Sequence, residues 1–458
     1  MGWNLLYATL LVAVSPMVIY RRWRYGRYRR GAAVKFFGID RSWANRATGG
    51  RRCRWIHAVS VGEVNLLVPL VERLDREEPG TPNIITTSTD TGYDLAVKWF
   101  GRERVSYAPL DFSWAIGRTH RSLRCKQLVL TELELWPNLI ATSHRRKVPI
   151  VVVNGRLNER SAGGYRRFGW FLRRTFARLD HVGCIGPADA RRFVRCGAHP
   201  ASVRVTGSLK FDNVTADRRH EAVQRLCRQC GVTGQQMVWV AGSTGPGEEV
   251  TVLDVYRQLR EESPNLRLII VPRHRERFDE VARTIEAAGF LSRRQTQFNS
   301  AGDEVAADRQ WSGHTVILGD TIGELKYWWG VGTIALVGGS FGNRGGQNMI
   351  EPAAYGNAVC YGPRTHNFRD VVAALESADA AHRVHNRGEL ETFVRRCLHD
   401  PEFMRRTGTA ARRVVREQRG ALGRTVRLVR MASGKPMADD LPTQEFEQNP
   451  HSVSSEAA

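Results

Sequence analysis

Short apolar runs alternate with amphipathic helical segments along most of the chain. Residues 53–60 have the pattern of a buried strand, and residues 61–78 carry an apolar stripe at helical spacing. The same order continues, with strands expected at 83–88, 127–131, 148–154 and 181–186, and helices at 92–100, 136–144 and 188–196. This alternation predicts a parallel sheet with helices on both of its faces.

The pattern restarts after a polar, helical stretch at 216–230. Strands are expected at 237–242, 266–271, 316–318, 333–337 and 358–361, and helices at 248–262 and 278–288. The sequence therefore predicts a second α/β domain, joined to the first by a linker near 211–217. Residues 402–431 predict one amphipathic, Arg-rich helix, and the polar residues 433–458 predict disorder.

The N-terminal segment is apolar and is followed by positive charge. Residues 3–20 are uncharged over 18 positions, which is about 27 Å of helix and marginal for a membrane span. The arginines that follow predict an uncleaved anchor, with everything after Arg21 on the cytoplasmic side. Asn4 and Pro16 leave open a helix that lies in the membrane interface instead.

Charge is distributed unevenly over the 458 residues. The formal net charge is +22, and residues 21–54 hold twelve Lys or Arg against one acid, Asp40. A basic block beside an apolar segment favours an anionic membrane surface over nucleic acid as the partner. Trp23, Tyr25 and Tyr28 within this block fit an interfacial aromatic belt.

Metal-binding patterns are weak in this chain. The eight cysteines are scattered, and the single pair Cys227-x-x-Cys230 lacks a second pair or histidines at a matching distance. No D-x-D sequence occurs. We expect buried, reduced thiols and no metal site.

One glycine-rich stretch has the features of an anion site. An expected strand ends at Val337, five glycines follow within residues 338–346, and a helix is expected from Asn348. Backbone N–H groups at such a helix start attract phosphate. Glu351 would repel a phosphate but suits a ribose, so the stretch predicts a nucleotide site. A flexible surface loop is the alternative.

Two acidic loops follow expected strands of the first domain. Ser60-x-x-Glu63 is a capping-box pattern, so the Glu63 carboxylate is either a helix cap or a catalytic base. Glu132 and Glu134 follow the strand 127–131, where like charges need cations nearby. The cations that we expect there are Arg156, Arg166 and Lys210.

Three further loops follow expected strands of the second domain. The stretch 241–249 is Gly-rich but lacks the spacing of an NTPase P-loop. Arg273 and His274 end a strand with a cation and an imidazole, which suits a phosphate or carboxylate, although a surface Arg and a capping His are the alternative. Residues 319–325 contain a second capping-box pattern, at Thr321 and Glu324.

Taken in order, these motifs resemble the 3-deoxy-D-manno-octulosonic acid (Kdo) transferases of lipopolysaccharide synthesis, over roughly residues 3–430. They are H-A-V-S-V-G-E (57–63), E-L-E-L-W-P-N (132–138), N-G-R-L-N-E-R-S (154–161), V-T-G-S-L-K-F-D (205–212), A-G-S-T (241–244), V-P-R-H (271–274), G-D-T-I-G-E-L (319–325) and G-G-S-F…G-G-Q-N-M-I-E-P (338–352). Eight motifs in the same order make the resemblance specific.

The resemblance implies two Rossmann-like domains, the GT-B glycosyltransferase fold, with an N-terminal apolar membrane-anchor helix. The implied divisions are an anchor and basic segment (1–30), an acceptor-binding domain (31–212), a donor-binding domain (213–405), a helix that returns to the first domain (406–432) and a disordered tail (433–458). The implied reaction is an inverting transfer of Kdo from CMP-Kdo to a lipid A precursor, without metal or other cofactor. Its implied location is the cytoplasmic face of the inner membrane, and no nucleic acid is involved.

Residue roles follow from the same resemblance. Glu63 is the implied general base, and Glu132 is implied to contribute to catalysis. The implied donor-binding residues are Ser243, Thr244, Arg273, His274, Gly323, Gly339, Ser340, Phe341, Asn348 and Glu351. Arg156 and Lys210 are weaker candidates for contacts with the acceptor or with the Kdo carboxylate.

The sequence departs from the usual family pattern at Gly245 and Gln347, where histidines are usual, and at Arg275, where proline is usual. These changes bear on donor affinity rather than on the reaction class. Two alternatives stay open: a transferase of the same fold that uses another sugar nucleotide, and a membrane-tethered protein that binds a nucleotide or anionic lipid without catalysis.

Physical reasoning adds expectations about the mechanism. The N-terminus of a helix should lower the pKa of Glu63 and keep it ionised. Arg273 and the N–H groups of the 338–346 loop should stabilise the leaving phosphate in place of a metal. Glu351 should hold the ribose, Asn348 should order the helix start, and closure about 211–217 should exclude water.

Overall fold

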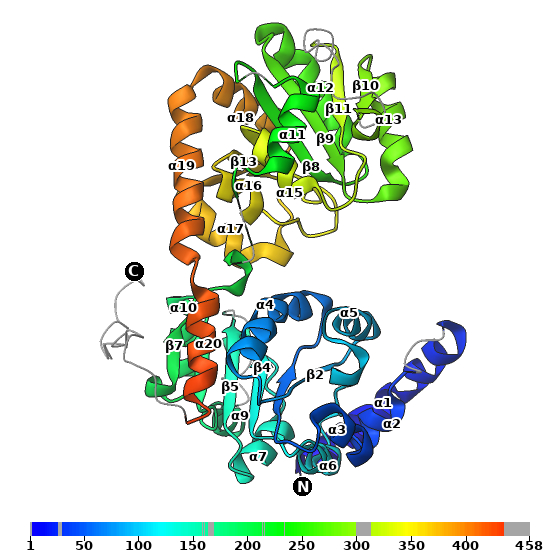
Figure 1. Cartoon of the computed structure of the whole chain (residues 1–458), viewed down its shortest axis with the longest axis vertical. Coiled ribbons are helices and arrows are strands. Elements are labelled where there is room, and N and C mark those ends of the chain that lie inside the picture. Colours follow the sequence, from blue (N-terminus) through cyan, green and yellow to red (C-terminus); the bar gives the residue numbers. More distant parts are fainter. Residues whose placement is uncertain are drawn as a thin grey trace, which may run out of the picture. The chain divides into compact units, whose positions relative to one another are not determined.

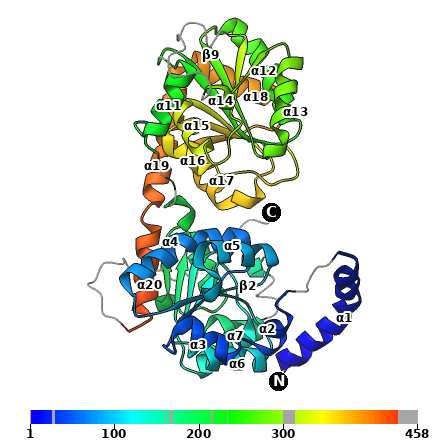
Figure 2. The same ribbon diagram turned by 45° about the vertical axis from the view of Figure 1, so that its right-hand side comes forward.

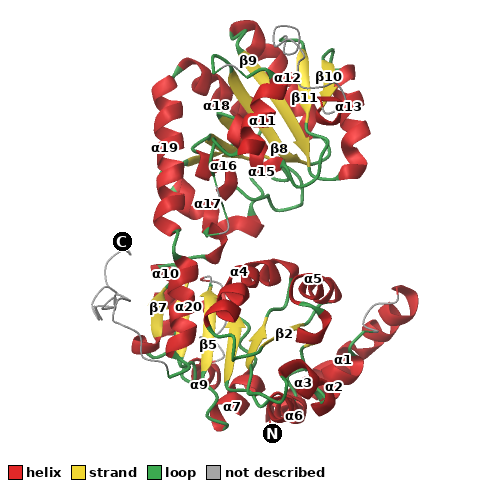
Figure 3. Cartoon of the chain, in the orientation of Figure 1, coloured by secondary structure: helices red, strands yellow, loops and turns green. Residues whose placement is uncertain are grey.

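The computed structural model describes residues 2–25, 30–157, 159, 161–163, 169–212, 214, 216–232, 234–298 and 313–434 (Figure 1). The predicted cation Arg166 and nearly all of the predicted disordered tail lie outside these residues. The chain divides into two compact units, Met1–Asn213 together with Arg419–Ala458, and Val214–Gln418. Within the described residues each unit is built on one seven-stranded parallel sheet with helices around it (Figure 3), which confirms the predicted pair of α/β domains.

The sheet of the first unit has the order β3-β2-β1-β4-β5-β6-β7. Its strands are β1 (Arg54–His57), β2 (Asn83–Thr87), β3 (Val105–Tyr107), β4 (Gln127–Thr131), β5 (Ile150–Gly155), β6 (His181–Cys184) and β7 (Val203–Val205). Strands β1, β2, β4 and β5 are buried along their whole length, as their continuous apolar runs predict for a sheet covered on both faces.

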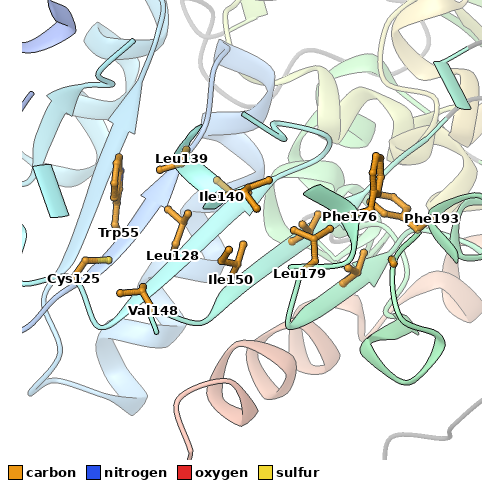
Figure 4. Packing of buried hydrophobic residues seen from close by; sticks show 14 of the residues in the cluster. Trp55, Cys125, Leu128, Leu139, Ile140, Val148, Ile150, Phe176, Leu179 and Phe193 are labelled. Atoms are coloured by element: carbon orange, nitrogen blue, oxygen red, sulfur yellow. The ribbon is translucent and has the colours of Figure 1, made fainter. Parts of the chain in front are cut away.

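Alternate strand residues of the first unit enter two separate cores. Ile56, Val129 and Val151 pack on one face against α4 (Val61–Glu77) and α20 (Ala421–Met431). Trp55 and Leu128 belong to the cluster on the other face (Figure 4). The remaining helices of this unit are α2 (Ala32–Phe37), α3 (Arg41–Thr48), α5 (Asp90–Phe100), α6 (Ser113–Leu123), α7 (Pro137–Arg145), α9 (Gly169–Phe176) and α10 (Pro187–Arg195).

The sheet of the second unit has the order β10-β11-β9-β8-β12-β13-β14. Its strands are β8 (Met237–Thr244), β9 (Leu266–Pro272), β10 (Leu291–Arg294), β11 (Thr315–Leu318), β12 (Ile334–Val337), β13 (Ala358–Tyr361) and β14 (Ala381–Arg383). Its helices are α11 (Glu221–Cys230), α12 (Glu248–Glu262), α13 (Phe278–Ala287), α14 (Gln295–Phe298), α15 (Leu325–Val331), α16 (Ile350–Tyr355), α17 (Arg369–Glu376), α18 (Arg387–His399) and α19 (Pro401–Gln418).

The prediction of a single helix at 402–431 is wrong. The chain forms two helices, α19 and α20, because Gly420 takes a left-handed conformation with φ of 86°. The Asp212 carboxylate accepts hydrogen bonds from the N–H groups of Gly420, at 2.6 Å, and of Leu422. This carboxylate therefore caps the start of α20 within the first unit.

The expected N-terminal anchor forms one helix, α1 (Gly2–Tyr25). Among the helices that the structure describes, none is long and apolar enough to cross a bilayer. The first turn of α1 is fixed to the first unit, since Asn4 exchanges two hydrogen bonds with Ser113 of α6, at 2.7 and 3.1 Å. Figure 2 shows this end of α1 beside α2 and α6.

Candidate active site

Each sheet has a point at its middle where the strand order reverses, and ligands of such folds bind outside the carboxyl ends of the strands at that point. In the first unit the reversal lies between β1 and β4, which pair directly. In the second unit it lies between β8 and β12. The segments that follow these four strands carry Glu63, Glu132, Glu248 and the glycines of 338–346, so predicted site residues or their neighbours lie at both reversal points.

Glu63 lies in the first turn of α4, directly after the loop that ends β1. Ser60 is the N-cap: its Oγ accepts the Glu63 N–H at 3.5 Å and donates to Glu63 Oε1 at 3.0 Å. The Val59 N–H donates to Glu63 Oε2 at 2.8 Å, and the whole residue is only 8% exposed. The predicted capping box is thus confirmed, except that the carboxylate accepts the backbone N–H of Val59 instead of that of the N-cap residue Ser60.

The expected lowering of the Glu63 pKa is wrong. The pKa of this carboxyl is raised to about 7, mainly by burial and also by the nearby carboxylates of Glu132 and Glu134. The hydrogen bonds from Val59 and Ser60 act in the opposite direction but do not offset the loss of water. Glu63 therefore exchanges its proton near neutral pH, as a general base at pH 7 requires.

Glu132 follows β4 in a strained conformation. Its φ is 57° and that of Asn154, at the end of the adjacent β5, is 53°, a left-handed region that costs a non-glycine residue about 1–2 kcal/mol. The Asn154 side chain donates weakly to Glu132 Oε1 at 3.5 Å and accepts from the Leu209 N–H at 3.1 Å. Glu134 accepts from the indole of Trp136 at 2.9 Å. Three acidic side chains are thereby gathered at the reversal of the first sheet.

The predicted cations come from the same edge of the first sheet. Arg156 follows β5, and Lys210 lies in the short 3-10 helix Leu209–Phe211 that comes after β7. Both side chains are partly exposed. Their proximity to the acidic loops and their contacts with a substrate stay predictions.

The predicted donor residues of the second unit also lie along one edge of their sheet. Ser243 and Thr244 end β8, Arg273 and His274 follow β9, Gly323 follows β11, and the 338–346 loop follows β12. These strands are neighbours in the order β11-β9-β8-β12. The structure therefore brings together residues that span more than a hundred positions of the sequence.

The glycine-rich loop already holds an anion, the side chain of Glu248 in the first turn of α12. Glu248 Oε2 accepts the N–H groups of Gly245 at 2.7 Å and Gly339 at 2.8 Å. Its Oε1 accepts those of Ser340 and Phe341, both at 3.0 Å. The expectation that these loop N–H groups bind the donor phosphate is therefore wrong for residues 339–341, because a buried carboxylate already occupies them.

Ser340 and Thr244 are structural in their present positions. Ser340 is fully buried, and its hydroxyl donates to the Val337 carbonyl at 2.7 Å and accepts the Gly362 N–H at 2.8 Å. Thr244 is also fully buried, and its carbonyl accepts the Arg273 N–H at 3.2 Å. Ser243 is strained at a φ of 57°. These residues shape the loops rather than present hydroxyl groups at the surface.

The exposed cations at this edge of the second sheet come from two loops. Arg273 is exposed and interacts electrostatically with Glu351. The guanidinium of Arg344, in the glycine-rich loop, donates to Nε2 of His274, which ties that loop to the end of β9. Arg344 was not predicted, and its place within a five-glycine loop was the only signal for it.

Glu351 and Asn348 form the start of α16. The Asn348 side chain accepts the Ile350 N–H at 3.1 Å, which confirms its predicted part in ordering this helix start. Its amide donates to Glu351 Oε1 at 3.0 Å. Burial raises the pKa of Glu351, while Asn348 and the cations Lys326 and Arg273 oppose that rise. A carboxylate held in this way can accept hydroxyl hydrogen bonds.

The described residues contain no group of three His, Cys, Asp or Glu side chains that could hold a metal ion. All eight cysteines are among them and carry free thiols, with Cys227 half-buried and the others buried. The structure thus agrees with the expected reduced, mostly buried thiols.

Comparison with known proteins identifies relatives along nearly the whole chain. Residues 24–213 match the family described as 3-Deoxy-D-manno-octulosonic-acid transferase (kdotransferase). The 3-deoxy-D-manno-octulosonic acid transferase of Haemophilus influenzae is 32% identical, over 93% of this chain and 98% of that protein. The transferase of the same name from Bordetella pertussis is 32% identical, over 92% of this chain and 97% of that protein.

The fold also has counterparts among solved structures. A glycosyltransferase from Rickettsia africae matches with a TM-score of 0.51, over 83% of this chain and 99% of that one, at 12% identity. At this identity the match concerns the fold alone.

Proposed function

Because this chain belongs to the 3-deoxy-D-manno-octulosonic acid (Kdo) transferase family and is a glycosyltransferase, we propose that it moves Kdo from CMP-Kdo to a lipid A precursor. The proposed reaction inverts the anomeric centre and needs no metal. The observation that carries the proposal is Glu63, a buried carboxyl with a pKa near 7 at the reversal point of the first sheet.

Glu63 is the proposed general base. In an inverting transfer, a hydroxyl of the acceptor attacks the sugar from the face opposite the leaving CMP, and a carboxylate accepts its proton. A base with a pKa near 7 is about half ionised at pH 7 and has a higher proton affinity than an ordinary carboxylate. Glu132 keeps that affinity high, since its negative charge opposes the ionisation of Glu63.

The donor is proposed to bind at the edge of the second sheet. Arg273 and the Arg344–His274 pair supply positive charge for the leaving phosphate, a part that a metal plays in other transferases. Glu351 accepts hydrogen bonds from the ribose hydroxyls, and Gly323 allows a close approach of the chain. The N–H groups of Gly339, Ser340 and Phe341 contribute indirectly, because Glu248 fixes the loop in which they lie.

The acceptor is proposed to meet the first unit at an anionic membrane surface, at the cytoplasmic face of the inner membrane. Helix α1 exposes apolar side chains, with Leu5 and Val12 each 72% exposed. The basic residues of 21–54 favour anionic lipid. Arg156 and Lys210 are the proposed contacts for the phosphates of the acceptor or the carboxylate of Kdo.

The test is a transfer assay with the purified full-length chain, a lipid A precursor and CMP-Kdo generated in situ, in the presence of EDTA. We expect transfer by the parent and a loss of at least about a hundredfold in Glu63→Gln, as for removal of a general base. Equal transfer rates in the parent and in Glu63→Gln would show that Glu63 is not the general base. Transfer only after addition of a divalent metal would contradict metal independence, and transfer only from UDP-sugars would contradict the donor.

A further inference from the structure

The first unit contains an apolar pocket that the proposed reaction does not yet use. Its volume is about 290 Å³, near the lower end of the range for small-molecule pockets. It opens among the carboxyl ends of β1, β2 and β3 and the start of α7. Its walls include His57, Val59, Leu110, Asp111 and Trp136.

Two polar groups of this pocket, Asp111 and His57, are already engaged or neutral, and the ammonium of Lys35 lies 4.5 Å from the centre of the Tyr107 ring. The Asp111 carboxylate accepts the N–H groups of Asn138 and Leu139, at 2.9 and 2.8 Å, and so caps α7. His57 Nδ1 lies 3.2 Å from the carbonyl of Thr86, and burial lowers its pKa to about 4, so its ring is neutral at pH 7. The pocket therefore offers mainly apolar surface to a ligand.

The pocket shares its walls with the loops that carry the acidic residues. Val59 lines it and donates its N–H to Glu63 Oε2 at 2.8 Å. Trp136 lines it and donates its indole N–H to Glu134 Oε2 at 2.9 Å. A single residue, Val59, would thus separate a ligand in the pocket from the proposed base Glu63.

A helix with an exposed apolar surface is fixed to the wall of the same pocket. Tyr7 of α1 hydrogen-bonds to the carboxylate of Asp111, and Asn4 is bonded to Ser113, two residues further on. Leu5 and Val12, on either side of Tyr7 along α1, are each 72% exposed. The pocket therefore lies beside a surface suited to lipid.

We propose that this pocket receives the end of one acyl chain of the acceptor and so places the acceptor hydroxyl at Glu63. The inference rests on the proposed function, because it assigns an apolar part of the same acceptor to a separate subsite. A nucleobase fits the pocket less well, because its ring nitrogens and carbonyl oxygens would lose water without gaining partners.

The experiment measures KM and kcat for lipid A precursors whose acyl chains are shortened one methylene at a time, with the full-length parent and with Leu110→Trp. Leu110 is partly exposed at the pocket, so a larger ring there fills the cavity without entering the core. For the parent we expect KM to rise about fourfold for each methylene removed from the pocket, at nearly constant kcat. For Leu110→Trp we expect a high KM that no longer depends on chain length.

Leu291→Trp is the matched control, since it places the same substitution on a side chain of the second unit that is 67% exposed. It should behave as the parent does. Leu110→Ala, which widens the pocket, should keep the dependence on chain length and covers the case in which Leu110→Trp does not fold. An equal KM for every chain length would contradict the proposed binding of an acyl chain in the pocket, but it would not contradict the proposed function. If the folded parent did not transfer Kdo from CMP-Kdo, both the proposed function and the proposed acyl-chain pocket would be contradicted.

Discussion

Glu63 combines two properties that oppose each other, burial and ionisation. The residue is 8% exposed and its carboxyl accepts hydrogen bonds from Val59 and Ser60, yet the carboxyl lies near the negative charges of Glu132 and Glu134. The helix N-terminus alone would favour the ionised form. Loss of water and like charge outweigh it, so this carboxyl is protonated over part of the physiological pH range.

The first prediction concerns the pH dependence of transfer. Since only the carboxylate form of Glu63 accepts a proton, kcat/KM should rise with pH about tenfold per unit below pH 7 and level off above about 7. Glu134→Gln removes one nearby negative charge and should move the midpoint to lower pH. A midpoint that stays in place in Glu134→Gln would show that the two carboxyls are not coupled.

The second prediction concerns stability. The pKa of Glu63 is raised in the folded state from its ordinary value of 4.5 to about 7, so the folded state holds the proton more tightly. Its contribution to stability is therefore present at low pH and is lost as pH rises through about 7. From pH 5 to pH 8 the parent should lose about 2–3 kcal/mol relative to Glu63→Gln in urea unfolding. A constant difference between the two proteins would contradict the raised pKa.

At the scale of elements, the glycine-rich loop after β12 depends on the first turn of α12. Four N–H groups point at one buried carboxylate, an arrangement that backbone concavities form around phosphates in other proteins. The loop is therefore preorganised before any donor arrives. The groups that it exposes toward solvent are side chains such as that of Arg344.

The third prediction is that Glu248→Ala disorders this loop. Four buried N–H groups would lose their acceptor, and we expect a loss of about 3 kcal/mol or more in urea unfolding, since each unsatisfied group costs about 1–3 kcal/mol. KM for CMP-Kdo should rise at least tenfold, with partial recovery in Glu248→Gln, which retains one acceptor oxygen. Glu261→Ala, an exposed change on the same helix, is the control and should alter neither quantity. An unchanged KM for CMP-Kdo in Glu248→Ala would separate this loop from donor binding.

Prediction from sequence succeeded for elements with a long hydrophobic pattern and failed for short edge elements. The buried run of β5 and the stripe of α4 were recognised because each fills a core face. The strands β3, β7, β10 and β14 were missed, since each has three or four residues at the edge of a sheet and little apolar pattern. The spacing of apolar residues shows which positions are buried, and these short strands contain too few residues to form such a pattern.

The same limit applies to the site. The glycine-rich loop and its place after a strand could be predicted, but the anion that it holds could not. Glu248 lies about ninety residues earlier in the sequence, and only the pairing of β8 with β12 brings it there. A helix-opening acid next to a glycine turn is the signal that was available, and it is also typical of an ordinary helix start.

At the scale of the whole molecule, the first unit is built from two distant parts of the chain. Val426, Leu428 and Val429 of α20 are at most 2% exposed and complete the core above β4 and β5. Gln127, at the start of β4, donates to the Val429 carbonyl at 2.6 Å and accepts from the buried Arg54 at 2.6 Å. The C-terminal helix is therefore part of the first unit and not an appendage.

The fourth prediction compares two truncations. In a chain that stops after Gln418 the first unit should not fold. Burial of each of the three aliphatic side chains contributes about 1.5–3 kcal/mol, whereas the free energy of unfolding of a whole domain is only about 5–15 kcal/mol. A chain that stops after Gly434 should unfold like the parent. Circular dichroism melts and protease digestion would measure both. Two cooperative transitions in the shorter chain, as in the longer one, would contradict this account.

The return of α20 to the first unit also constrains the order of events on the ribosome. The seven strands of that unit have been synthesised once Val205 has emerged, yet the helix that covers one of their faces follows only after Val214–Gln418. At about 5–20 residues per second this interval lasts about 10–40 s. Throughout this interval the valines of β4 and β5 have α4 but not α20 packed against them. We therefore expect the nascent chain to bind chaperones, while the second unit, which is continuous in sequence, can fold first.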